Sequence, residues 1–177
     1  MKSVFPVSQM AQELDRLACE AGFVGEPLAE IQDLPIRAYS KAKEDLPTVY
    51  LSAGIHGDEP AGPLALKRLF EEGFFGDQAN WLICPMLNPV GLKFGQRENS
   101  DGVDLNRDYL SLSTPEVEGH VKWLRRQGPL DLALSLHEDY ESTGFYLYEI
   151  NCAECPSDAL AVLKAVSKVF PPEPNPI

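Results

Sequence analysis

Apolar and amphipathic stretches alternate along most of the chain, and this alternation predicts an α/β fold. Leu34, Ile36 and Ala38 alternate with other residues and predict a strand, which we place at a sheet edge. A further strand is predicted at residues 145–150. Three short runs are nearly all apolar, as expected for strands covered on both faces of a sheet: residues 48–53, 81–84 and 132–136.

The amphipathic stretches predict four helices, at residues 8–21, 60–72, 115–127 and 157–169. Ser8 is the expected N-cap of the first helix, and Gly22 is its stop signal. Pro60 suits the first turn of the second helix because its φ is fixed. The third helix opens with a capping box, Ser113-Thr114-Pro115-Glu116.

The segment between residues 88 and 108 is polar and rich in Gly and Asn, and it has neither a helical nor a strand period. A loop of this length inside a compact domain is usually functional or disordered. We therefore predict no regular structure in this segment, and we expect functional residues there.

Length and composition predict one ordinary domain. The chain has 177 residues, of which 44% are hydrophobic, so it can build a normal core and is not a disordered chain. It contains no run of about 20 apolar residues and no apolar signal core near Met1, so we expect a soluble, cytoplasmic protein. The 15 Lys and Arg against 27 Asp and Glu leave a net charge of −12, which argues against nonspecific binding to nucleic acid or an anionic membrane.

The four cysteines do not predict a disulfide framework, because no secretory signal accompanies them. Cys152 and Cys155 have the spacing of a metal knuckle, but no second pair follows, as a structural zinc site would need. We interpret them as two loop thiols.

Two histidines follow predicted buried strands directly. His56 comes after residues 48–53, with Glu59 at the mouth of the next helix, and His137 has the matching place after residues 132–136. Ligands of open α/β sheets bind beyond the carboxyl ends of the strands. The sequence therefore predicts that two imidazoles and one carboxylate meet at one sheet edge.

Two His and one Glu around an open position form the usual ligand set of a catalytic zinc site. Gly54 and Gly57 would let the backbone turn tightly enough for His56 and Glu59 to converge. A His-x-x-Glu pair alone often arises by chance, and His137 at an equivalent strand end makes a metal site the favoured interpretation. His120 lies inside the predicted third helix, so we interpret it as a helix-surface residue and not as a ligand.

The polar segment carries further motifs, Asn88-Pro89-Val90-Gly91, Arg97 and Gly102-Val103-Asp104-Leu105-Asn106-Arg107. Together with the His-x-x-Glu pair and the later histidine, in this order, they resemble the zinc carboxypeptidases and their relatives, the succinylglutamate desuccinylase and aspartoacylase family. The resemblance spans about residues 49–148. It implies that family's phosphorylase/hydrolase-like fold, a mixed and mostly parallel sheet flanked by helices.

The same resemblance implies a cofactor, one Zn²⁺ ion. His56, Glu59 and His137 would be its ligands. Asp104 would accept a hydrogen bond from the imidazole of His56, fixing its tautomer and raising its basicity.

The resemblance also implies how a substrate is held. Arg97 would act catalytically, by stabilising the oxyanion that forms when water attacks an amide carbonyl. Asn106 and Arg107 would bind the free carboxylate of the substrate, for which a planar guanidinium is well suited. Alternatively, both arginines are solvated loop charges, which is the more common situation of Arg outside a motif.

One part of the family's machinery is not found. The glutamate that acts as general base lies on a late strand, after the segment that matches residues 145–150, and further strands belong to that sheet. Three explanations are open: the chain is part of a longer protein, it is a truncated and inactive protein, or Glu138, Glu141 or Glu149 acts instead. We favour the first explanation, a single zinc-hydrolase domain over residues 1–177 that lacks its C-terminal strands.

These observations lead to one main hypothesis and two alternatives. The main hypothesis is a zinc metallocarboxypeptidase that hydrolyses an amide bond next to a free carboxylate. The alternatives are an N-acyl amino acid deacylase and a noncatalytic module that binds zinc or a carboxylate. The expected partner is a peptide or an acyl-amino acid, and the oligomeric state stays open.

Overall fold

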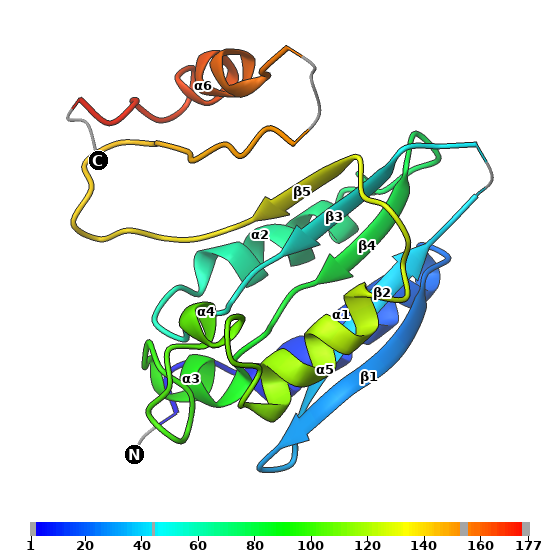
Figure 1. The fold of residues 1–177 in the computed structure, drawn as a ribbon, viewed down its shortest axis with the longest axis vertical. Coiled ribbons are helices and arrows are strands. Elements are labelled where there is room, and N and C mark those ends of the chain that lie inside the picture. Colours follow the sequence, from blue (N-terminus) through cyan, green and yellow to red (C-terminus); the bar gives the residue numbers. More distant parts are fainter. Residues whose placement is uncertain (1–2, 44, 153–155, 175–177) are drawn as a thin grey trace. The chain divides into compact units, whose positions relative to one another are not determined.

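A computed structural model describes residues 3–43, 45–152 and 156–174. The chain forms two compact units, Met1–Glu138 and Asp139–Ile177. The first unit contains the sheet (Figure 1). It also contains the candidate metal ligands and the three other residues predicted to bind or stabilise a substrate, Arg97, Asn106 and Arg107. Among the described residues, no helix is both long and apolar enough to cross a lipid bilayer.

The first unit is built on a mixed five-stranded sheet with the order β1-β2-β4-β3-β5. The strands β3, β4 and β5 are parallel to one another, whereas β2 is antiparallel to both of its neighbours. The mixed α/β architecture expected from the sequence is confirmed. The strand bounds are Val24–Ile31 (β1), Leu34–Lys41 (β2), Thr48–Ser52 (β3), Asn80–Cys84 (β4) and Leu132–Ser135 (β5).

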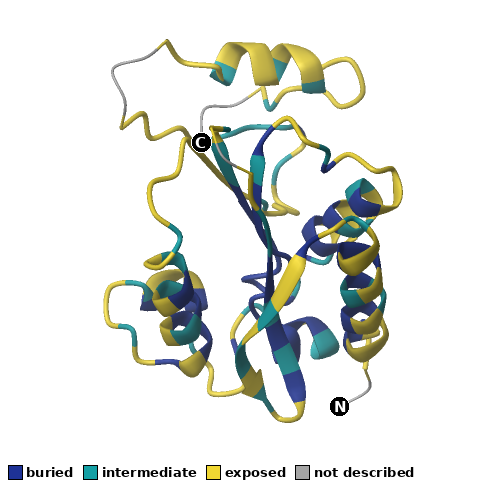
Figure 2. Cartoon of the chain, turned by 90° about the vertical axis from the view of Figure 1, so that its right-hand side faces the viewer, coloured by how far each residue is buried: buried dark blue, intermediate teal, exposed yellow. Residues whose placement is uncertain are grey.

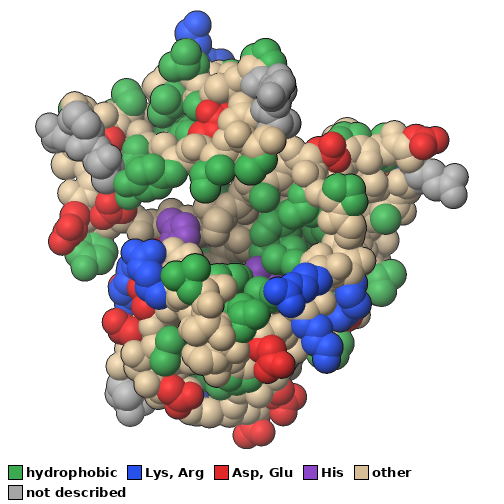
Figure 3. Space-filling view, in the orientation of Figure 1, with side chains coloured by type: hydrophobic (Ala, Val, Ile, Leu, Met, Phe, Trp, Pro, Cys, Tyr) green, Lys and Arg blue, Asp and Glu red, His purple; other side chains and the backbone are tan. Residues whose placement is uncertain are grey.

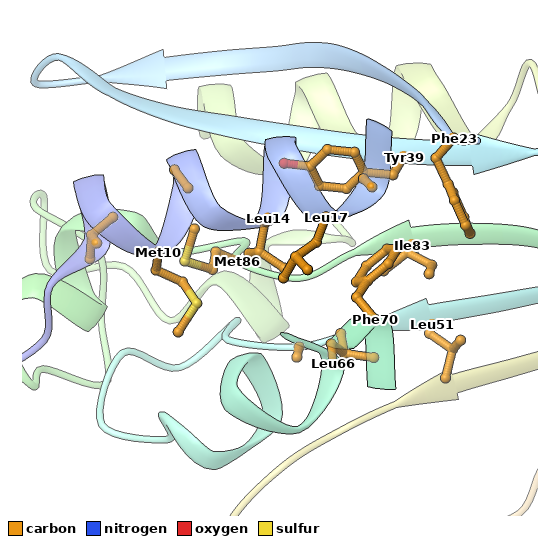
Figure 4. Close-up of a cluster of buried hydrophobic side chains, with 14 of the residues drawn as sticks. Met10, Leu14, Leu17, Phe23, Tyr39, Leu51, Leu66, Phe70, Ile83 and Met86 are labelled. Carbon is orange, nitrogen blue, oxygen red and sulfur yellow. The ribbon is translucent and has the colours of Figure 1, made fainter. Parts of the chain in front are cut away.

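Helices pack on both faces of the sheet at its centre. Neighbouring residues of a strand point to opposite faces, so successive residues of β3 enter different clusters. On one face, Leu51 of β3 packs in a cluster with residues of α1 and α2 (Figure 4). On the other face, Tyr50 belongs to a second cluster, which includes residues of α5. Figure 2 shows the burial concentrated in the sheet and on the inner sides of these helices. The helices of the first unit are α1 (Val7–Glu20), α2 (Ala61–Glu71), α3 (Pro89–Phe94), α4 (Leu105–Asp108) and α5 (Pro115–Leu124).

The second unit has little regular structure. Its described residues contain one helix, α6 (Ala159–Val166), none of whose residues is buried (Figure 2). The carboxylate of Glu173 accepts hydrogen bonds from the backbone N–H groups of Thr143 and Gly144, and Phe145 forms an isolated bridge with Pro172. The strand expected at residues 145–150 is therefore wrong, and the last helix is shorter than the expected 157–169. Cys152 is exposed, and Cys155 lies outside the described residues.

The strands differ from expectation in three respects. β1 was not expected, because Gly25 and Pro27 disfavour a strand and a bulge between Pro27 and Ala29 interrupts the alternation. Because β1 pairs with β2, the strand containing Ile36 is not at an edge of the sheet. β5 is present as expected, but its residues are exposed and not covered on both faces.

The helices of the first unit differ from expectation at three places. α5 ends at Leu124 and not at residue 127. α1 begins one residue earlier than predicted, with Pro6 and not Ser8 at the N-cap position and without a side-chain cap. The polar segment does contain regular structure, because α3 and α4 lie within residues 88–108. Each has only four to six residues, too few for a helical period to show in the sequence.

Candidate active site

The two strands that precede the candidate ligands are neighbours in the sheet. β3 and β5 run parallel, with Ser52 opposite Ser135, so both strands end at the same edge. His56 follows four residues after Ser52, and His137 two residues after Ser135. The expected meeting of these segments is confirmed.

The backbone turn that carries His56 and Glu59 depends on two glycines, one before His56 and one between His56 and Glu59. Gly54 has a φ of 62°, in the left-handed region that favours glycine. Gly57 lies against the start of α3, where an added Cβ would be 1.9 Å from the backbone carbon of Gly91. The turn is therefore held against α3 by a close approach of two backbones.

His56, Glu59 and His137 form a compact cluster. Nδ1 of His56 lies 2.6 Å from Oε1 of Glu59, and Nδ1 of His137 lies 2.8 Å from Oε2 of the same carboxylate. One ligand atom from each residue lies within 4.8 Å of the others. His56 and Glu59 are buried, whereas the side chain of His137 is 34% exposed, so the cluster is open on the His137 side. Figure 3 shows histidine atoms and basic side chains reaching the same face of the molecule.

Asp104 lies behind His56. Its Oδ1 is 3.2 Å from Nε2 of His56 and also accepts a hydrogen bond from the backbone N–H of Asn106, as the N-cap of α4. With a carboxylate at each ring nitrogen, His56 can hold a proton on both; a cation bound at Nδ1 would replace the proton there, and Asp104 would keep the one on Nε2. The same oxygen thus links the cluster to α4.

The cluster has strongly perturbed protonation. Burial alone would raise the pKa of Glu59, but hydrogen bonds with His137, His56 and the backbone of Glu138 outweigh it and lower the pKa to about 2. Burial alone would lower the pKa of His56, but the hydrogen bond and charge of Glu59 outweigh it and raise the pKa above its usual value. The carboxylate therefore stays charged and attracts a cation, either a proton on an imidazole or a metal ion.

Arg97 reaches this cluster from the polar segment. Its Nη1 lies 3.7 Å from Oε1 of Glu59, and its Nη2 lies 3.3 Å from Oδ2 of Asp104. Its backbone carbonyl accepts hydrogen bonds from Gly57 N–H and from Nδ2 of Asn88. The side chain is 41% exposed, so the guanidinium borders both the carboxylates and the solvent.

Asn106 and Arg107 lie on α4, and both are exposed. Within the part of the chain that the structure describes, neither side chain forms a hydrogen bond or ion pair, so both are available to a ligand. The C-terminal end of α4 is fixed by Asp108, whose carboxylate accepts hydrogen bonds from Ser111 Oγ and from Thr114 N–H and Oγ1. Burial opposes ionisation of Asp108, but hydrogen bonds from the neighbouring Ser and Thr residues keep its pKa far below the usual range.

The carboxylates considered as substitute bases have other contacts. The carboxylate of Glu138 accepts a hydrogen bond from Ala61 N–H at the start of α2, while its own N–H donates to Oε2 of Glu59. Glu141 and Glu149 belong to the second unit, where Glu149 accepts a hydrogen bond from Ser157.

His120 is the one histidine that the sequence interpretation misplaced. It is only 3% exposed, and its ring nitrogens face the hydroxyls of Tyr50 and Tyr109. The expectation of a helix-surface residue is wrong. The signal was its spacing, three residues from both Val117 and Trp123, which are buried on the inner face of α5.

Comparison with known proteins gives consistent results. The sequence profile of the succinylglutamate desuccinylase/aspartoacylase catalytic domain matches residues 45–168. Carboxypeptidase 2 of Trichophyton rubrum is 28% identical over 133 residues, which cover 67% of this chain and 24% of its own length. A candidate metallopeptidase from Shewanella denitrificans OS217 is 25% identical, with a TM-score of 0.83 over 93% of this chain and 65% of that one.

A metallo-carboxypeptidase from Pseudomonas aeruginosa, solved in complex with (2-guanidinoethylmercapto)succinic acid, is 26% identical. Its TM-score is 0.62, over 75% of this chain and 39% of that chain. The present chain thus spans about a quarter of the length of the Trichophyton relative and less than two thirds of the length of either solved structure. The family profile covers more than half of the chain, from the start of β3 through the whole candidate site, and the chain belongs to the succinylglutamate desuccinylase/aspartoacylase catalytic-domain family.

Proposed function

We propose that this chain carries the metal centre and the carboxylate-binding part of a zinc-dependent hydrolase that cleaves an amide bond next to a free carboxylate. The observation that carries the proposal is the cluster of His56, Glu59 and His137, with Asp104 behind one imidazole and Arg97 beside the carboxylate. Family membership supports a hydrolase of the carboxypeptidase and aspartoacylase type.

The donor atoms suit zinc. Two imidazole nitrogens and one carboxylate oxygen are the usual protein ligands of catalytic Zn²⁺, with the remaining position open to water or substrate. The carboxylate of Glu59 is ionised, and Asp104 favours the His56 tautomer whose Nδ1 can accept a cation. A bound zinc ion would supply Lewis acidity and lower the pKa of a water molecule at the site.

The other residues position and stabilise the substrate. The Arg97 guanidinium, next to the ligand carboxylate and open to solvent, would stabilise negative charge on the carbonyl oxygen under attack. Asn106 and Arg107 would hold the substrate carboxylate with an amide donor and a bidentate guanidinium. In a chain of net charge −12, these arginines provide local positive charge for an anionic substrate.

Two substrate classes share this chemistry. Peptidase activity is supported by the carboxypeptidase names of the relatives and by the Pseudomonas enzyme, whose bound ligand is a substituted succinic acid. Deacylation of an N-acyl amino acid is supported by the family profile. We favour the peptidase. Assays of peptides with a free C-terminus, the same peptides with an amidated C-terminus, and N-acetyl and N-succinyl amino acids would separate the classes.

Metal content tests the centre directly. We expect one Zn²⁺ per chain after reconstitution and dialysis, and a loss of this zinc in the Glu59→Gln variant. Glu118→Gln, the same change at an exposed position of α5, is the matched control and should keep the metal. Equal zinc content in the two variants would refute the ligand assignment.

The noncatalytic alternative predicts a different combination. A module that only binds would retain zinc and carboxylate ligands but show no hydrolysis, even in the longest product of its reading frame. Activity in that longer product, but not in this chain, would locate the general base outside residues 1–177.

A further inference from the structure

His120 of α5 lies between two tyrosine hydroxyls. The hydroxyl of Tyr50 lies 2.7 Å from Nε2 of His120, and the hydroxyl of Tyr109 lies 2.6 Å from Nδ1 of the same ring. The imidazole also stacks on Trp123, with an interplanar angle of 23°. His120 thus has a polar partner at each ring nitrogen and an aromatic neighbour on its face.

This arrangement requires a neutral imidazole with defined partners. A neutral ring donates one hydrogen bond and accepts one, so one tyrosine hydroxyl must donate to it and the other must accept. Burial lowers the pKa of His120 to about 4, which keeps the ring neutral near pH 7. Because each hydroxyl is matched to one nitrogen, the contact fixes both tyrosines in position and direction.

The two tyrosines belong to the two halves of the candidate site. Tyr50 is on β3, the strand that leads to His56, and Tyr109 follows α4 directly. Leu105 of α4 is fully buried in the same apolar cluster as Tyr50. His120 therefore joins the strand before the metal cluster to the short helix with the exposed Asn106 and Arg107.

We propose that His120 is a positioning residue, which holds α4 at a fixed place relative to β3 through Tyr109 and Tyr50, and so sets the place of Arg107. This rests on the proposed function in one respect, the role of Arg107 as a carboxylate ligand. A helix of four residues has little stability of its own, so its position must come from such tertiary contacts.

Three Tyr→Phe variants separate positioning from simple loss of stability. Tyr109→Phe removes the hydroxyl that ties α4 to His120, and Tyr50→Phe removes the one on β3. Tyr39→Phe is the matched control, because Tyr39 is also buried and its hydroxyl donates to Asp15 on the opposite side of the sheet. Each change removes one hydroxyl and leaves the ring in place.

Amide hydrogen exchange in the full chain tests the position of α4 whether or not the protein is active. The Arg107 N–H donates to Asp104, and the Leu112 N–H donates to Asp108. We expect both amides to exchange roughly fivefold faster or more in Tyr109→Phe and Tyr50→Phe, but not in Tyr39→Phe. Unchanged exchange in Tyr109→Phe would overturn the proposal, as would an equal change in Tyr39→Phe.

A binding measurement then tests the functional consequence. N-acetylglycine is titrated into each variant, with the Nε–Hε resonance of Arg107 as the reporter and neutral N-acetylglycinamide as the control ligand. We expect binding of the carboxylate only, weakened roughly fivefold or more in Tyr109→Phe and unchanged in Tyr39→Phe. If Arg107 of the unaltered protein does not respond to N-acetylglycine, its proposed function fails, while the exchange experiment still decides whether His120 positions α4.

Discussion

Acid should destabilise this protein, and His120 makes a contribution that can be isolated. The ring is buried and neutral, and its pKa in the folded protein is about 4, whereas an unfolded chain gives a histidine a value of about 6.5. Between these values the unfolded state binds a proton that the folded state does not bind. Stability therefore falls as the pH is lowered from about 6.5 to 4, and the loss ends below the folded value.

The size of the effect follows from the shift. A difference of about 2.5 pKa units corresponds to about 3 kcal/mol, at 1.36 kcal/mol for each unit. His120 is only 3% exposed, so solvent screening reduces this value little. Since a domain of this size is stable by about 5–15 kcal/mol, the loss is a large fraction of the total.

Urea unfolding at several pH values measures this loss, with tryptophan fluorescence as the signal. Both tryptophans of the chain, Trp81 and Trp123, are buried in the first unit, so the signal reports on that unit. Glu59 and Asp104 also lose favourable contacts in acid, and His120→Gln removes only the histidine contribution. The free-energy difference between the unaltered protein and His120→Gln should change by about 3 kcal/mol between pH 7 and 4. Parallel pH profiles of the two proteins would refute the reasoning.

Three further perturbations should have measurable outcomes. Gly57→Ala forces a Cβ against the backbone of Gly91, so we expect the unfolding free energy to fall by about 3 kcal/mol or more and zinc to bind more weakly. Urea unfolding and calorimetry measure the two effects, and unchanged values would contradict the close approach. Leu66→Ala should cost about 2–5 kcal/mol, whereas Leu64→Ala on the exposed side of the same helix should cost much less; equal losses would contradict the packing of α2. Zinc affinity should rise with pH over the range in which His56 titrates, by about tenfold per pH unit for each proton released, because the metal competes with the proton on His56. A flat pH profile in competition titrations would speak against His56 as a ligand.

The cluster of His56, Glu59 and His137 was predictable because it follows from sheet topology. Apolar runs mark the strands before His56 and His137, and parallel neighbours end at the same edge of a sheet. The exposure of β5 was not predictable in the same way. A strand's own apolar pattern shows which residues could be covered, but not which part of the protein covers them.

Other elements were missed because polar contacts and pairing, not apolar periodicity, determine them. β1 is a strand because β2 provides its hydrogen-bond partner, even though Gly25 and Pro27 disfavour this conformation. The prediction of a surface position for His120 is wrong because a polar side chain inside a helix is usually exposed, and its two tyrosine partners lie 70 and 11 residues away in the sequence.

The polar segment that carries the motifs is held in place by buried polar side chains. Asn88 is fully buried, accepts from Gly91 N–H and donates to the carbonyl of Arg97. Asn99 accepts from the N–H groups of Asp101 and Val103, and donates to the buried Glu116 of α5. Each contact fixes backbone beside a candidate site residue, and a buried polar group without its partner is costly. Asn88 and Asn99 are therefore architectural residues, and with the buried Leu105 they help the segment to place Arg97, Asp104 and α4.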